Sequence, residues 1–164
     1  MPIGTFVIVA CLSGLFATVV LDIWQRLVHA IVGIPPANWA FVGRWFAWIP
    51  RGRLVHRPIG DTAAVEGELA LGWTLHYLIG LAYGFAYVGL MVYGLGRPPS
   101  LLNGLVFGTC SVVIPWFILQ PGLGIGVMGR MTPKPAIPIL NALANRMVYG
   151  SALYVGAALA TLAI

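Results

Sequence analysis

His76 has the most distinctive chemistry in this sequence, because it stands inside an otherwise apolar stretch. A neutral imidazole is a good metal and haem ligand, and Gly72 lies one helical turn away, where a small residue leaves room for a macrocycle. This pattern points to a haem or a chlorophyll-type pigment. The other interpretation is a structural histidine that is hydrogen-bonded to Tyr149, Asn145 or a backbone carbonyl. Both interpretations stay open, and apart from such a pigment we expect no cofactor.

A second candidate site consists of polar residues near the ends of two apolar segments. Asp22 and Arg26 are spaced i, i+4 and share one face of a helix, while Asn145 and Arg146 stand near the start of the last segment. We expect the four side chains to meet in a polar pocket at the inner ends of their helices. The pocket would serve a lipid headgroup or a proton path. Alternatively, the four residues form an ion pair of their own, with arginines that reach the interface.

The sequence lacks the residue sets that most enzymes use. It contains four acidic residues in total, and no serine, histidine and aspartate follow the pattern of a catalytic triad. Its two cysteines, Cys11 and Cys110, do not have the paired spacing of a metal site. We therefore expect neither enzymatic activity nor a bound metal.

Long apolar segments must position the candidate residues. Of the 164 residues, 60% are hydrophobic and 8% are charged, against roughly 25% charged in soluble domains. A bilayer core of about 30 Å needs about 20 apolar residues in a helix, and four segments reach that length. The sequence predicts an all-α fold, a four-helix transmembrane bundle in a single domain over residues 1–164. Its helices are expected at about 3–32, 69–93, 101–120 and 139–163.

The segment between the first two predicted spans is short, aromatic and basic. Residues 37–49 are too few to cross a bilayer, and tryptophans such as Trp39, Trp45 and Trp48 favour the headgroup layer. We expect a short amphipathic helix here that lies along the membrane surface in the first cytoplasmic loop. The basic residues behind it would bind anionic lipid headgroups. These residues are Arg51, Arg53 and Arg57.

Two of the predicted spans carry glycine pairs. Gly80 and Gly84 in the second span, and Gly104 and Gly108 in the third, have the small-xxx-small spacing that lets helix backbones approach closely. The sequence therefore predicts tight helix packing within one compact bundle.

The distribution of basic residues predicts the orientation in the membrane. Most of them lie in the first and third loops, whereas the second loop has only Arg97 and both termini have none. Since cytoplasmic loops carry an excess of Lys and Arg, we expect those two loops inside and both termini outside. The formal net charge of +5 is then explained by topology, and we expect no binding to nucleic acid.

Several short motifs are distributed along the chain. They are Gly33-Ile34-Pro35-Pro36, Val42-Gly43-Arg44-Trp45, Ile49-Pro50-Arg51-Gly52, Gly72-Trp73 with His76-Tyr77, Gln120-Pro121-Gly122-Leu123-Gly124 and Arg130-Met131-Thr132-Pro133. Taken together, they resemble the bacterial domain-of-unknown-function family 2938, over nearly the whole chain. The resemblance implies a four-helix protein of the bacterial inner membrane, here with both termini periplasmic. It implies no reaction and no functional residue.

Two functional hypotheses follow. The first is a non-catalytic accessory or assembly subunit that packs against a larger membrane complex, since the chain is small and its helix faces are lined with glycine. The second is a small carrier, or a pigment- or lipid-binding protein, that uses an inner-leaflet polar pocket around His76. The expected partners are membrane lipids, together with other membrane-protein subunits or further copies of this chain.

Overall fold

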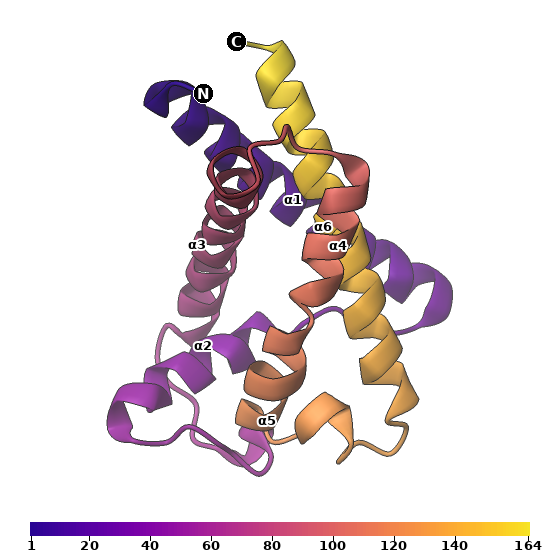
Figure 1. The fold of residues 1–164 in the computed structure, drawn as a ribbon. Coiled ribbons are helices and arrows are strands. Elements are labelled where there is room, and N and C mark those ends of the chain that lie inside the picture. The colour runs from indigo at the N-terminus through magenta and orange to yellow at the C-terminus, as the bar shows by residue number, and fades with distance from the viewer. The chain divides into compact units, whose positions relative to one another are not determined.

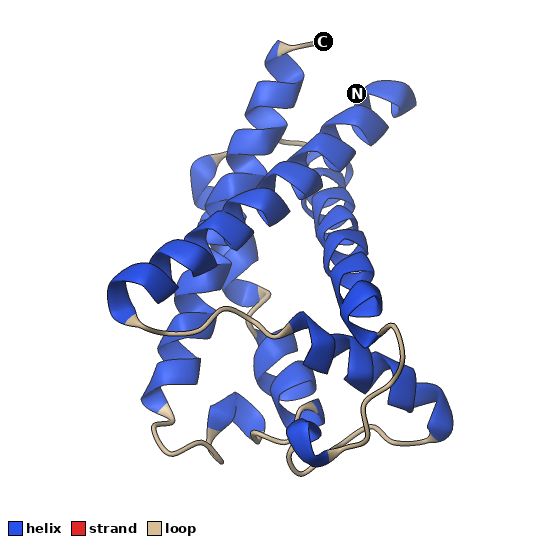
Figure 2. Cartoon of the chain, turned by 180° about the vertical axis from the view of Figure 1, so that it is seen from behind, coloured by secondary structure: helices blue, strands red, loops and turns tan.

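The computed structural model describes residues 1–164 and contains helices and loops without a strand (Figure 2). This confirms the all-α fold. The α-helices are α1 (Ile3–Val32), α2 (Trp39–Trp48), α3 (Glu68–Gly89), α4 (Leu101–Cys110), α5 (Gln120–Gly122) and α6 (Ala136–Leu162), as labelled in Figure 1. Shorter helical turns lie at Ile49–Arg51, Ile59–Asp61, Leu90–Gly94, Pro115–Leu119 and Val127–Gly129.

Three helical segments are long and apolar enough to cross a membrane. They are Ile3–Val32, Glu68–Gly94 and Leu101–Gly122, and they correspond to the first three predicted spans. The fourth predicted span is helical as α6, but that helix carries Asn145 and Arg146 and is not among the three. The structure is therefore compatible with a membrane protein that has three candidate spans.

The end of α1 follows from its local sequence. Gly33 adopts the left-handed conformation with a φ of 77°, and its N–H donates to the carbonyl oxygen of His29 at 3.0 Å. Glycine enters this conformation without a Cβ clash, and the prolines at 35 and 36 cannot continue the hydrogen-bond pattern of a helix. The predicted end of the first helix before these prolines is confirmed.

The chain divides into two compact units, which are described separately. The first, called the helix unit, consists of Met1–Pro36, Tyr77–Cys110 and Asn145–Ile164. The second, called the loop unit, consists of Ala37–His76 and Ser111–Ala144. The expectation of a single membrane domain stays a prediction.

Close glycine contacts join the helices of the helix unit. A Cβ on Gly84 of α3 would meet backbone atoms of Gly14 on α1. A Cβ on Gly104 or Gly108 of α4 would meet backbone atoms of Gly150 on α6. Contacts this close are possible because glycine has no side chain, and they increase the van der Waals attraction between helices. The predicted glycine faces therefore hold the chain's own helices together.

Buried hydroxyl groups add hydrogen bonds between the same helices. Ser13 Oγ on α1 donates to the carbonyl oxygen of Leu153 on α6 at 2.7 Å. Tyr149 OH on α6 donates to the carbonyl oxygen of Gly80 on α3 at 3.2 Å. An unpaired hydroxyl costs free energy in an apolar interior, so each bond satisfies a donor and also links two helices. The surrounding core includes Val9, Ala17, Tyr87, Val88 and Ala157.

In the loop unit, the third apolar segment departs from a regular α-helix. Pro115 has no N–H to donate to Ser111, and the N–H of Ile114 bonds to the Ser111 carbonyl oxygen instead, at 3.1 Å. A wider helical turn, Pro115–Leu119, follows and leads into α5. The helix predicted at 101–120 is therefore present with an irregular centre.

Two backbone hydrogen bonds fasten the segment before α3 to the last residue of α5 and to the residue that follows it. The N–H of His56 donates to the Gly122 carbonyl oxygen at 3.1 Å, and the N–H of Ile59 donates to that of Leu123 at 3.0 Å. Gly124 lies beside them with a φ of 85°, and a Cβ there would meet the carbonyl oxygen of His56. Glycine is required at this position both for its backbone conformation and for the close approach.

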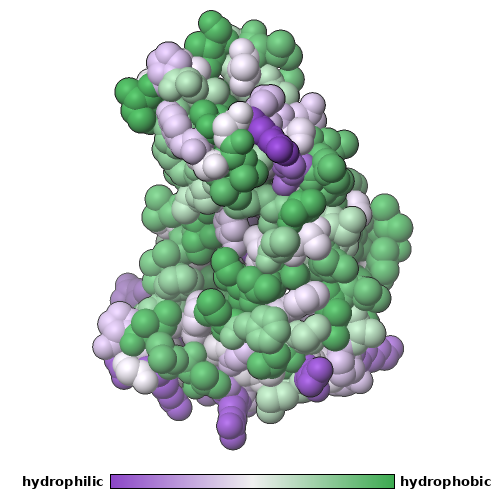
Figure 3. Space-filling view, viewed as in Figure 1, coloured by the Kyte–Doolittle hydropathy of each residue, from purple (hydrophilic) through white to green (hydrophobic).

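Much of the visible surface is apolar, as Figure 3 shows. Large hydrophobic side chains on α1 are exposed, among them Ile23 at 51% and Leu27 at 50%. In the most apolar window of each candidate span, between 22% and 39% of the residues are buried. Such a surface is unfavourable in water, whereas lipid tails are as apolar as a leucine side chain. The exposed faces are therefore available to lipid or to another membrane protein.

Replacement of Gly84 by alanine should lower the free energy of unfolding by about 1–3 kcal/mol, because the new Cβ forces α1 and α3 apart. Gly4→Ala is the matched control, since no atom lies within 4 Å of its Cβ position. The control should leave stability unchanged or raise it by up to about 1 kcal/mol through helix propensity. Denaturant titration in detergent measures the free energy of unfolding of both variants. Equal stability of the two variants would contradict the close contact.

Candidate functional site

The start of α3 and the middle of α2 are in direct backbone contact. A Cβ on Gly43 would collide with the carbonyl oxygen of Glu68, and a Cβ on Gly72 would collide with that of Trp39. The two helices can cross this closely only because both positions are glycine. The crossing brings Arg44, the neighbour of Gly43, next to Glu68.

Arg44 forms a bidentate ion pair with Glu68. Its Nε donates to Oε2 at 2.8 Å and its Nη2 donates to Oε1 at 2.6 Å. The two side chains are only 10% and 14% exposed. Oε2 also accepts the N–H of Val65 at 2.8 Å, just before α3 begins. The carboxylate therefore fixes the start of its own helix and holds α2 at the same time.

Arg44 reaches a third segment through Nη1. This nitrogen donates to the carbonyl oxygens of Ile59 at 3.2 Å and Thr62 at 2.8 Å. The hydrogen bonds that Arg44 donates to Glu68 raise the pKa of Arg44 above its usual value, and the charge of Glu68 adds to this, although burial acts in the opposite direction. The guanidinium is therefore always charged, and it cross-links α2, the turn at 59–62 and α3.

His56 is buried in the same unit, with 2% of its surface exposed. Its Nδ1 lies 2.9 Å from Thr62 Oγ1, and its Nε2 has no hydrogen-bond partner. Burial lowers the pKa of His56, and the charge of Arg53 lowers it further, while a hydrogen bond to the Arg53 backbone opposes both. The imidazole is therefore neutral at pH 7.

The predicted interfacial residues have different surroundings. Trp45 is 7% exposed, and its Nε1 donates to a backbone carbonyl oxygen at 2.8 Å. Trp48 is partly exposed, and the guanidinium groups of Arg51 and Arg53 lie 4.9 and 5.5 Å from its ring centroid. These arginines and Arg57 are exposed. Trp45 therefore packs inside the protein, and Trp48 with its arginines remains accessible.

The space beside His76 is filled by α2. The His76 ring stacks on Trp39, with 3.8 Å between the centroids and 26° between the planes. Trp39 also places its carbonyl oxygen against Gly72, where we expected room for a macrocycle. The structure therefore puts the backbone of α2 in the position that a pigment would need.

Two residues of the predicted polar pocket are bonded to aromatic side chains of the helix unit. Asp22 accepts a hydrogen bond from Tyr77 OH at 3.1 Å. Asn145 Oδ1 accepts one from Trp24 Nε1 at 3.0 Å. Asp22 is 7% exposed, so a hydrogen-bonded partner is necessary to offset the cost of burying its carboxylate.

The other two residues of that predicted pocket are arginines. The guanidinium of Arg146 lies 5.1 Å from the centroid of the Tyr83 ring and 5.9 Å from that of Tyr149. A cation over an aromatic face is attracted by the ring's quadrupole. Arg26 is exposed. Aromatic rings thus contact three of the four predicted pocket residues, and a shared pocket stays a prediction.

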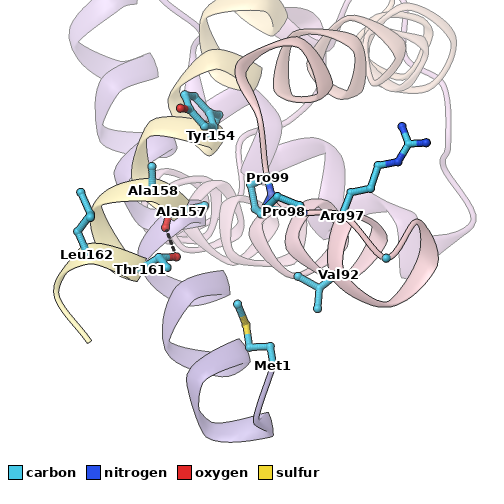
Figure 4. A pocket seen from close by; sticks show the side chains of 11 residues that line it. Met1, Val92, Arg97, Pro98, Pro99, Tyr154, Ala157, Ala158, Thr161 and Leu162 are labelled. Carbon is cyan, nitrogen blue, oxygen red and sulfur yellow. Dashed lines mark hydrogen bonds between the residues drawn. The ribbon is translucent and has the colours of Figure 1, made fainter.

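A cavity of about 530 Å³ lies in the helix unit, near the ends of α3 and α6 (Figure 4). Small side chains of α6, including Ala157 and Ala158, form part of its wall. Thr161 Oγ1 donates to the carbonyl oxygen of Ala157 at 2.8 Å, so its hydroxyl proton is already used. The side chain of Arg97 extends away from the residues of α6. The cavity is therefore mainly an apolar surface.

Sequence reasoning missed both the pairing of Arg44 with Glu68 and the buried His56. A signal for the pair is present, because Arg44 is the one charged residue in α2 and glycines stand at 43 and 72. A charge within an aromatic, apolar helix needs a partner. Glycines next to Arg44 and one turn after Glu68 indicate that the two helices cross closely there. No comparable signal identifies His56.

Replacement of Arg44 by glutamine should lower the free energy of unfolding by about 3 kcal/mol, because it leaves the carboxylate of Glu68 without its partner in a largely buried position. Arg51→Gln is the matched control at an exposed position and should cost less than about 1 kcal/mol. Denaturant titration in detergent measures the difference.

A double replacement of Arg44 and Glu68 by methionine sharpens this test. It should recover part of the loss, because no buried charge then remains unpaired. Full stability of the single Arg44→Gln variant would rule out a structural role for the pair.

The pH dependence of stability should report on His56. Since its pKa is lower in the folded protein, the unfolded chain binds more protons between the two pKa values. The free energy of unfolding should therefore be highest above the unfolded pKa of about 6.5 and decrease as the pH falls through it. His56→Gln should remove this contribution. Identical pH profiles of the variant and the wild type would show that the pKa of His56 does not change on folding.

Comparison with known proteins identifies a family and no activity. No curated protein and no solved structure matches the sequence. A family model described as "Protein of unknown function (DUF2938)" matches residues 11–160, well over half of the chain. The match agrees with the resemblance of the short motifs. This chain therefore belongs to the DUF2938 family.

Proposed function

We propose that the chain is a multi-pass protein of the bacterial inner membrane that serves as a non-catalytic subunit of a larger membrane assembly. The three candidate spans cross the bilayer, and α6 adds the fourth helix of a transmembrane bundle. Asn145 and Arg146 then lie near the inner interface, which a long arginine side chain reaches easily. Both termini lie in the periplasm, because the basic loops remain in the cytoplasm.

In this topology, α2 lies along the cytoplasmic surface of the membrane. The exposed arginines beside Trp48 support this placement, since an aromatic ring with adjacent cations suits the headgroup layer. Trp45 and Arg44 face the protein. One face of α2 would therefore pack against the rest of the loop unit, and the other would face the lipid headgroups.

An apolar groove on the helix unit is the observation that carries the proposal. The groove has a volume of about 510 Å³ and is lined by residues of α1, α4 and α6. Ser151 and Ala152 are the small residues of its lining, and Phe16 and Met147 are among the larger ones. Small residues let another helix approach closely, and larger ones at the sides increase the contact area. A transmembrane helix of a partner subunit fits this surface chemistry.

The alternative, a carrier or pigment-binding protein around His76, has less support. Trp39 stacks on the imidazole and its backbone lies against Gly72. Binding a macrocycle there would require α2 to leave α3, which would break the contacts between the two helices. The geometry therefore favours a structural histidine.

Extraction of the full chain from its native membrane in a mild detergent should yield a particle much larger than the 17.5 kDa chain. Light scattering gives its mass, and mass spectrometry identifies co-purifying proteins. Ser151→Phe should release the chain from the assembly, because the large ring fills the groove. Leu102→Phe is the matched control, since Leu102 is 70% exposed on α4 and does not line the groove.

The outcomes separate the two hypotheses. A wild-type particle of monomer mass without other proteins would refute the subunit proposal. A particle that contains only further copies of the chain would identify a homo-oligomer. A visible absorption band that disappears in His76→Ala would favour the pigment-binding alternative.

A further inference from the structure

The loop unit contains a polar cavity that the proposed function does not use. Its volume is about 460 Å³. Arg53 and Arg57 contribute positive charge to the lining, and Asp61 contributes negative charge. His56 and Thr62, both buried, add polar atoms. The cavity therefore presents both signs of charge together with neutral hydrogen-bonding groups.

The chain around this cavity is fixed by hydrogen bonds from outside it. Arg44 donates to the carbonyl oxygen of Thr62 at 2.8 Å. The N–H groups of His56 and Ile59 donate to the carbonyl oxygens of Gly122 and Leu123, at 3.1 and 3.0 Å. A site whose backbone is already ordered loses less conformational entropy when a ligand binds.

His56 offers an unused hydrogen-bond acceptor. Its ring hydrogen-bonds the backbone of Arg53, and Nδ1 lies 2.9 Å from Thr62 Oγ1. Since Nε2 has no partner, we assign the ring proton to Nδ1 and the lone pair to Nε2. Nε2 is covered in the structure, so a ligand with an N–H group reaches it only after a small shift of the surrounding side chains, and then relieves the cost of a buried acceptor without a donor.

The three charged side chains of the lining have no ion-pair partner within 4.0 Å. Two guanidinium groups suit the oxygens of a phosphate, which they bind in a planar, charge-assisted geometry. A carboxylate and an imidazole lone pair suit a primary ammonium, which has three N–H donors. The cavity is therefore complementary to a zwitterion that carries a phosphate and an ammonium.

We propose that this cavity binds the phosphoethanolamine headgroup of a membrane phospholipid. Its phosphodiester pairs with Arg53 and Arg57, and its ammonium with Asp61 and His56. The assignment rests on the proposed placement of the loop unit at the membrane surface. It departs from the sequence-based expectation of anionic headgroups, because Asp61 would repel a headgroup without an ammonium and Nε2 would stay unpaired.

Native mass spectrometry of the full chain in detergent tests the proposal. Phosphatidylethanolamine, phosphatidylcholine and phosphatidylglycerol with identical acyl chains are added at equal concentration. The ethanolamine lipid should bind about tenfold more tightly than either of the others, because the choline group has no N–H and the glycerol group has no charge. Equal binding of all three lipids, or a preference for the glycerol lipid, would overturn the proposal.

Asp61→Asn tests the role of the carboxylate. Asp61 is exposed, so the variant should fold, and unchanged thermal stability would verify this. The preference for the ethanolamine lipid over the glycerol lipid should fall about tenfold. Arg51→Gln is the control, because Arg51 is exposed and does not line the cavity. An equal change of lipid preference in Asp61→Asn and Arg51→Gln would show that the lipids respond only to the overall charge of the protein, and would refute the site.

Soluble glycerophosphoethanolamine separates the lipid from a free ligand. It should compete only weakly, because it lacks the acyl chains that hold the headgroup at the site. If glycerophosphoethanolamine bound as tightly as the lipid does, the acyl chains would contribute nothing to binding. The ligand would then be a small soluble molecule, and the assignment to a lipid would be overturned. Since the purified chain is used, failure of the subunit proposal would leave these results unaffected.

Discussion

The ion pair between Arg44 and Glu68 is the interaction on which the loop unit depends. A guanidinium inside an aromatic, apolar helix is costly unless its donors are used, and here Nε, Nη1 and Nη2 all donate. From α2 the donors reach the turn at 59–62 and the start of α3, so one side chain connects three segments. The contact between Gly43 and Gly72 brings the charges within reach of each other. Glycine packing and charge pairing are thus parts of one arrangement.

The helix unit satisfies the same physical constraint with different groups. In an apolar interior, a polar atom without a partner costs free energy, and hydroxyl groups of these helices supply several of the partners. Ser13 and Tyr149 donate to carbonyl oxygens of neighbouring helices, and Asp22 and Asn145 accept from aromatic side chains. These polar atoms stabilise packing. The surfaces that we connect with function are therefore the groove of the helix unit and the cavity of the loop unit, each contained within its own unit.

Apolar length and the positions of glycine and proline were sufficient to predict most of the helices. The first predicted helix has the same bounds as α1, because Gly33 and the prolines that follow it define its end. The irregular centre of the third segment depends on how Pro115 and its neighbours share hydrogen bonds, which a hydropathy pattern does not contain. The partners of the polar residues were not predicted either. Arg44 and Glu68 are 24 positions apart, and Trp24 and Asn145 are 121 apart, so their pairing depends on how helices cross.

Amide hydrogen exchange of the segment before α3, in the detergent-solubilised protein, tests most directly whether the Arg44 cross-link makes the loop unit a folded structure. This segment has only a short helical turn, so an isolated loop of the same sequence would exchange rapidly. We expect the amides of His56 and Ile59, which are bonded to the carbonyl oxygens of Gly122 and Leu123, to exchange as slowly as those of α2. Exchange at these two amides as fast as in an unstructured peptide would contradict it.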